Sequence, residues 1–169
     1  MTLTASEPTQ PDHESSEGLP AAGLWRRLAA MLYDGFLVVA IWMVLGYFIQ
    51  FVFGTETNQV VNGRVETDPI QDTVLFLMMI ASSFSFYAWF WTRSGQTLGM
   101  IAWRLRTQQP NGELVTFAQA ARRYLLAWPS FFLLGMGYFW LYLDGNGDAL
   151  HDRFSSTRVV LLPRSHRPF

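Results

Sequence analysis

An acidic residue, Asp34, lies inside a run of apolar residues that is long enough to cross a membrane. It is the only charged side chain between residues 28 and 53. A carboxylate in the hydrocarbon of a bilayer costs several kcal/mol unless it finds a partner, so an acid in this position is interpreted first as a functional group. The chemistry that it predicts is the binding and release of H⁺ or Na⁺.

The nearest cation in the chain is Arg27, seven residues before Asp34. Seven residues are about two helical turns, so both side chains share one face of a helix. The spacing is too long for direct contact on a straight helix. We therefore expect water, or a group from another segment, to complete a link between the two residues.

Other catalytic and metal-binding chemistry finds little support. The chain has no Cys and no Lys, which excludes disulfides, thiolate sites and lysine-based catalysis. His151 and Asp152 are adjacent, and adjacent side chains seldom converge on one atom, so a structural or orienting role is expected rather than an acid–base pair or a metal site. We predict no enzyme activity, no metal and no cofactor. A net charge of −1 gives no basic face for nucleic acid.

The elements that must position these residues are membrane helices. Residues 28–53 and 74–91 are each apolar over about the twenty residues that cross a hydrocarbon core of roughly 30 Å. Residues 124–143 carry no charge but contain Pro129, Gly135 and Gly137. The predicted fold class is an all-α integral membrane protein with two transmembrane helices. Residues 124–143 form either a third apolar span or a re-entrant hairpin.

The arginines predict the orientation. They precede the first helix and follow the second, whereas the loop 54–72 carries four acids against Arg64. The positive-inside rule then places the N-terminus and residues 93–123 in the cytoplasm and the loop outside. Three full spans would put the C-terminus outside, but four arginines after residue 150 favour the inside, which would make 124–143 a broken or re-entrant segment.

Short strands are expected in the cytoplasmic part. Residues 100–107 alternate as a half-buried strand does, and Pro110-Asn111-Gly112 is a strong turn signal. Residues 114–117 could return as the second strand of a hairpin, after which Thr116 could cap an amphipathic helix. Residues 157–162 are a further β-branched run that could join this small sheet.

Several pieces in this order resemble the RDD family of small bacterial membrane proteins, named for one Arg and two Asp. They are Gly23-Leu24-Trp25-Arg26-Arg27-Leu28-Ala29-Ala30 with Asp34, Gly95-Gln96-Thr97-Leu98-Gly99-Met100, Asn111-Gly112 with Phe117, Arg122-Arg123, and His151-Asp152 with Thr157-Arg158-Val159-Val160. The resemblance implies that Arg27 is the family arginine and that Asp34 and Asp152 are its two acids. It divides the chain into an acidic, disordered tail (1–20), an RDD-like transmembrane domain (21–162) and a C-terminal tail (163–169).

Two interpretations of Arg27, Asp34 and Asp152 follow. They could form a relay for H⁺ or Na⁺, or a structural staple in which the arginine and the two acids satisfy one another at the cytoplasmic rim. The family implies an inner-membrane protein that takes part in transport of ions or small solutes. The alternative is a non-catalytic scaffold or accessory subunit that binds a protein partner. Gly95 with Gly99, and Ala81 with Ser85, have the small-residue spacing that lets helices approach closely, and the second pair lies within a predicted helix, which allows a homo-oligomer.

Overall fold

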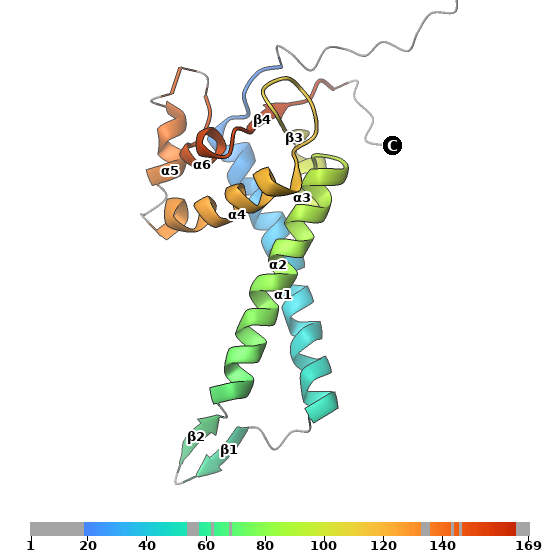
Figure 1. Cartoon of the computed structure of the whole chain (residues 1–169), viewed down its shortest axis with the longest axis vertical. Helices are drawn as coiled ribbons and strands as arrows, with labels where there is room; N and C mark the ends of the chain where they lie inside the picture. Colours follow the sequence, from blue (N-terminus) through green and yellow to red (C-terminus); the bar gives the residue numbers. More distant parts are fainter. Residues whose placement is uncertain are drawn as a thin grey trace, which may run out of the picture.

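The computed structural model describes residues 19–53, 58–61, 63–67, 69–132, 136–142, 144–145 and 147–164. Two long helices stand side by side, with a small hairpin at one end and a compact head at the other (Figure 1). Most of the predicted tail 1–20, and most of the predicted tail 163–169, lie outside the described residues.

The two long helices are α1 (Leu24–Phe53) and α2 (Pro69–Arg93). Both are long and apolar enough to cross a membrane, and few of their residues are buried inside the protein. At 1.5 Å per residue α1 is roughly 45 Å long, which exceeds the hydrocarbon thickness. Large apolar side chains are exposed along them, including Phe36, Val44, Phe48, Phe51, Phe76 and Leu77. The structure thus contains both predicted spans, each begun four or five residues earlier than the apolar runs indicated.

The helices are joined near their middle. Trp42 of α1 donates its indole N–H to the Met79 carbonyl and to Ser83 Oγ of α2, each at 3.0 Å. At the end far from the head, β1 (Asn58–Val61) pairs antiparallel with β2 (Arg64–Thr67). Gly63 takes the positive φ of 74° that this tight turn requires. This hairpin lies within the segment 54–72, where the sequence predicted only a loop.

The head contains α3 (Leu98–Ala102), β3 (Leu105–Gln108), α6 (Leu150–Phe154) and β4 (Arg158–Leu161). β3 pairs antiparallel with β4, with Leu105 opposite Leu161. The predicted hairpin between 100–107 and 114–117 is wrong. Residues 98–102 are helical, and residues 114–116 are not in a strand. The predicted helix cap at Thr116 is confirmed, because the Thr116 N–H donates to Gln119 Oε1 and the Gln119 N–H donates to Thr116 Oγ1.

The third apolar segment is divided among three elements. α4 (Phe117–Phe132) contains Pro129, and it is followed by α5 (Met136–Phe139) and the 3₁₀ turn η1 (Trp140–Tyr142). Within the described part of the chain, α1 and α2 are the two helices that could cross a membrane. The described residues therefore do not confirm a third span. α4 lies across the top of the two long helices (Figure 1).

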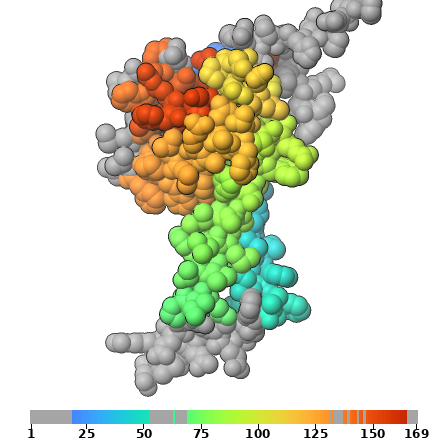
Figure 2. Space-filling view, in the orientation of Figure 1, coloured from blue at the N-terminus to red at the C-terminus, as the bar shows by residue number. Residues whose placement is uncertain are grey.

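Both described ends of the chain lie in the head. The Ala22 N–H bonds the Val159 carbonyl at 2.9 Å, and the Leu161 N–H bonds the Pro20 carbonyl at 2.9 Å. Because residues 20–22 enter α1 and residues 159–161 form β4, the two ends lie on the same side of the spans. Figure 2 shows this head as a wide mass above a narrower two-helix stalk.

Candidate functional site

Arg27 sits in the first turns of α1, where the helix meets the head, and it is 6% exposed. Its Nη1 pairs with Asp152 Oδ2. Its Nε donates to the Ala22 carbonyl at 2.9 Å, and its Nη2 reaches the Gly147 carbonyl at 3.2 Å. One guanidinium therefore ties the start of α1 to the loop before α6 and to α6 itself. The guanidinium group can make all these bonds at once because it is planar and carries five N–H donors.

Asp152 is the centre of a buried ion cluster. The Asp152 side chain is inaccessible to solvent, and its other oxygen, Oδ1, pairs with Arg123 Nη1 from α4. Arg123 Nη1 also donates to Thr157 Oγ1 at 2.8 Å. Burial acts to raise the pKa of Asp152, but the two guanidinium groups, Arg123 and Arg27, hold it well below its usual range. The cluster Arg27–Asp152–Arg123 joins α1, α4 and α6 and carries one excess positive charge.

His151 lies beside this cluster and is uncharged at neutral pH. Its Nε2 is 3.4 Å from Asp152 Oδ1, and its ring packs on Tyr138 with 4.8 Å between ring centres. Burial, helped by the two arginines and opposed by Asp152, lowers the pKa of His151 to about 4. The imidazole can therefore accept or donate a hydrogen bond through its remaining nitrogen, but it adds no charge.

Asp34 and Arg27 form no direct pair in the described part of the chain, as their spacing predicts, and the link through water stays a prediction. Thr97 Oγ1 donates to Asp34 Oδ2 at 2.5 Å, and the Gly99 N–H donates to Oδ1 at 2.8 Å. Asp34 therefore binds the beginning of α3, where orphan N–H groups attract a carboxylate. The three residues Arg27, Asp34 and Asp152 do not form one constellation: two of them meet, and Asp34 is held elsewhere.

The two glycines singled out in the sequence serve close packing within one chain. A Cβ on Gly99 would lie 2.9 Å from Asp34 Oδ1 and would also strike the Ala30 carbonyl. Gly95 has φ of 73°, and a Cβ there would lie 2.6 Å from the Thr107 carbonyl oxygen. Neither position has room for a side chain. Both precede or begin α3, which the Asp34 carboxylate fixes against α1.

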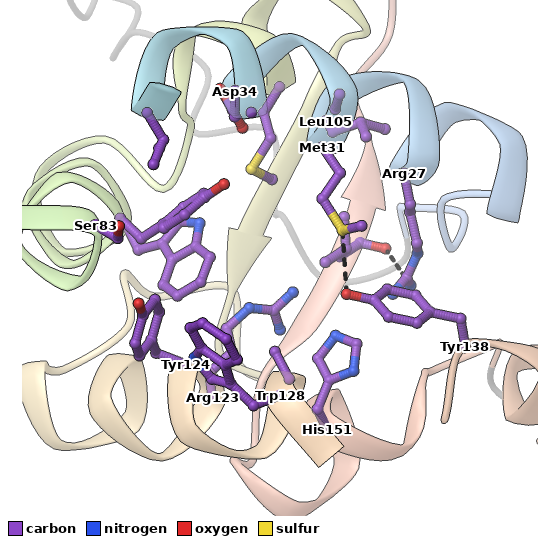
Figure 3. A pocket seen from close by; sticks show the side chains of 18 of the residues that line it. Arg27, Met31, Asp34, Ser83, Leu105, Arg123, Tyr124, Trp128, Tyr138 and His151 are labelled. Atoms are coloured by element: carbon purple, nitrogen blue, oxygen red, sulfur yellow. Dashed lines mark hydrogen bonds between the residues drawn. The ribbon is translucent and has the colours of Figure 1, made fainter. Parts of the chain in front are cut away.

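A cavity of about 390 Å³ lies between α1, α2, α4 and the head. Figure 3 shows Arg123 and His151 extending toward it from one side, with Arg27 and Asp34 on the α1 side. Its remaining lining is largely apolar and aromatic, and it follows α1 as far as Trp42. This size and this mixture of apolar walls with a few polar groups are typical of sites for small ligands.

Sequence reasoning missed Arg123 and Thr97 as site residues. A sequence pattern could have identified Arg123. Ala120, Tyr124 and Ala127 recur at helical spacing and predict one buried face of the helix. Arg123 lies on that face, whereas Arg122 is exposed. Thr97 had a weaker signal, since a Thr just before a short apolar run is a common helix N-cap. Its bond to Asp34 spans 63 residues and has no local signature.

The chain matches a known family over most of its length. The model of the RDD family matches residues 21–156, which include Arg27, Asp34, Arg123 and Asp152. No curated protein and no solved structure gives a significant match. The family match and the two apolar helices together indicate a membrane protein. On the strength of that match, the chain belongs to the RDD family.

Proposed function

We propose that this RDD-family protein takes part in the transport of an ion or a small solute across the bacterial inner membrane, and that its cavity holds the solute. The observation that carries the proposal is the course of the cavity. It runs from the buried charges of Arg27 and Arg123 to Trp42, on the membrane-spanning part of α1. A site that connects a charged pocket to the flank of a span is suited to a molecule that enters or leaves the bilayer.

The geometry favours a small solute over a bare H⁺ or Na⁺ at Asp34. Both oxygens of Asp34 already accept hydrogen bonds, from Thr97 and from Gly99. A carboxylate in such a position acts as a structural staple between α1 and α3. The cavity itself, in contrast, offers room for several non-hydrogen atoms.

Two helices by themselves cannot enclose a path for a polar solute. A path for a polar solute through the hydrocarbon must be lined by protein or water, because lipid cannot satisfy polar groups. The proposal therefore includes a homo-oligomer or a second membrane protein that covers the open flank of α1 and α2. The exposed apolar side chains of both helices are compatible with such a neighbour and with lipid.

The head is expected to face the cytoplasm. Arg26, Arg27, Arg93, Arg104, Arg106, Arg122, Arg123, Arg153, Arg158 and Arg164 all belong to the head end of the two spans. By the positive-inside rule this end stays in the cytoplasm. A green fluorescent protein fused after residue 169 should fluoresce, and alkaline phosphatase fused at the same point should be inactive. Active phosphatase would contradict this orientation.

Transport is tested with the purified full chain in lipid vesicles. In one arm a sodium gradient is imposed and internal pyranine reports proton movement. In the other arm the vesicles take up radiolabelled octanesulfonate, a permanently charged solute with a short apolar chain. We expect flux well above that of empty vesicles in at least one arm. Gly35→Leu should abolish it, because Gly35 lines the cavity and an added Cβ there meets no atom within 4 Å.

Gly46→Leu is the matched control for this variant. Gly46 also lies in α1 with no atom within 4 Å of an added Cβ, but it does not line the cavity. Its flux should equal that of the wild type. If wild-type and empty vesicles behave alike in both arms, transport by this chain alone is ruled out, and the alternative of a non-transporting scaffold or accessory subunit takes its place.

A further inference from the structure

Three residues that line the cavity each have a buried polar atom with no hydrogen-bond partner within the described part of the protein. The atoms are Trp91 Nε1, Arg123 Nε and His151 Nδ1, and their residues are at most 8% exposed. Buried polar groups are nearly always paired, so three of them on residues that line one cavity suggest that a ligand supplies the partners. The indole and guanidinium atoms can only donate, and the ligand must therefore accept.

The Arg123 guanidinium lies over the Trp91 ring and brings positive charge to this part of the cavity. The Arg123 guanidinium carbon is 5.0 Å from the centre of the Trp91 ring. Arg27 and Arg123 share the single carboxylate of Asp152, which leaves one positive charge uncompensated in that cluster. Asp34 also lines the cavity, but both its oxygens are bound to Thr97 and Gly99. The end of the cavity next to Arg123 thus favours an anionic acceptor over a neutral one.

The opposite end of the cavity is apolar. From Arg27 to Trp42 the lining follows fifteen residues of α1, which is about 22 Å along a helix. Val38, Val39 and Trp42 form this wall, and they lie in the segment that crosses the membrane. Arg27 lies at the head end of that segment, the end that a spanning α1 would place at the membrane surface. A ligand that fits both ends has a polar head at the level of the membrane surface and an apolar part at the depth of the hydrocarbon.

We propose that the cavity binds an anionic amphiphile, with the oxygens of a carboxylate or phosphate head taken by Arg123 Nε and Trp91 Nε1 and a single apolar chain directed along α1 toward Trp42. His151 Nδ1 completes the head site as a donor, in the tautomer that carries the proton on that nitrogen. The inference rests on the proposed function, because it names the class of solute that the same cavity takes. The head can belong to a free fatty acid or to a membrane phospholipid, of which one chain occupies the cavity and the other stays in the bilayer.

The test uses a long-chain carboxylate that carries a photoreactive diazirine in its chain. The full protein in phosphatidylcholine vesicles is irradiated with this probe, and the labelled peptides are identified by mass spectrometry. Labels are expected on the cavity face of α1 between Gly35 and Trp42. Excess unlabelled carboxylate, or phosphatidic acid if the natural head is a phospholipid, should remove them. The primary alcohol of the same length should not. Labelling displaced by neither anion, or displaced equally by the alcohol, would overturn the proposal.

Two pairs of variants locate the site. Trp91→Phe keeps the ring but removes its N–H, and it should weaken competition by the anion about tenfold, as expected for one hydrogen bond to a charged group. Trp89→Phe, an exposed tryptophan of the same helix, should change nothing. Gly35→Leu should abolish the labels and Gly46→Leu should keep them. Unchanged labelling in both Trp91→Phe and Gly35→Leu would place the probe outside the cavity.

The outcomes for the two proposals separate cleanly. Competable labelling without flux in either vesicle arm would support the amphiphile site and contradict transport. Proton or sodium flux without competable labelling would support transport and contradict the amphiphile.

Discussion

Replacing Asp152 with asparagine is expected to destabilise the protein by about 3–5 kcal/mol, the usual effect of removing one partner from a buried ion pair. The variant leaves Arg27 and Arg123 close together without a counter-charge, although both side chains are almost fully buried. It also weakens the bond from the Ala149 N–H, 3.1 Å from Asp152 Oδ2 in the wild type. Unfolding of the purified protein in detergent, followed by circular dichroism, measures the change.

Arg153→Gln is the matched control on the neighbouring residue of α6. Arg153 forms a single pair with Asp144 at 3.2 Å, and its side chain is 65% exposed. Exposed pairs contribute about 0–1 kcal/mol, so this variant should unfold close to the wild type. If Asp152→Asn also unfolds like the wild type, the ion cluster does not hold α1, α4 and α6 together.

The cluster contributes more to the specificity of helix packing in the head than to the free energy of unfolding. Burying three charges carries a desolvation penalty that well-packed apolar residues would avoid. In return, Asp152 has two specific partners on two different helices, and an altered packing of the head would leave at least one charge unpaired. The same arrangement leaves the Arg123 Nε free at the cavity. We infer that the geometry of the cavity depends on the cluster.

The two spans could be predicted from sequence because hydropathy and length suffice to define a membrane helix. The sheet in the head could be predicted only in part. The strand near residues 105–108 pairs with β4, some fifty residues later, instead of with the adjacent 114–117. Local turn chemistry at residues 110–112 favoured the nearer partner. The cap formed by Thr116 and Gln119 removes that segment from the sheet, and the competition between cap and strand is decided by tertiary packing.

For the candidate site, too, the sequence indicates which residues are important but not which residues they contact. Arg27, Asp34 and Asp152 stand out in the sequence because charges are rare near its apolar segments. Their contacts could not be predicted: Arg27 and Asp152 are 125 residues apart, and Asp34 meets Thr97 and Gly99. The i, i+7 spacing correctly placed Arg27 and Asp34 on one helix, but each side chain has a nearer partner from the head.

Lowering the pH from about 6.5 to 4 is expected to reduce the free energy of unfolding by about 3 kcal/mol through His151 alone. Burial lowers the pKa of His151 to about 4, against an ordinary value near 6.5 in the unfolded chain. Between these values the unfolded state binds a proton that the folded state does not, so stability falls as the pH falls. The contribution is fully present above pH 6.5 and lost near pH 4.

The slope of stability against pH in the wild type and in His151→Gln isolates this effect. Glutamine cannot titrate, so the variant should lack the loss between about pH 6.5 and 4. Asp148, whose pKa is raised by burial, acts in the opposite direction in both proteins and cancels in the comparison. An anion bound beside His151 would favour its protonated form, and the wild-type loss should then become smaller when excess octanesulfonate, which stays charged at pH 4, is present. Equal slopes in the wild type and in His151→Gln would show that the imidazole is not buried in its neutral form, and would remove it from the head site of the cavity.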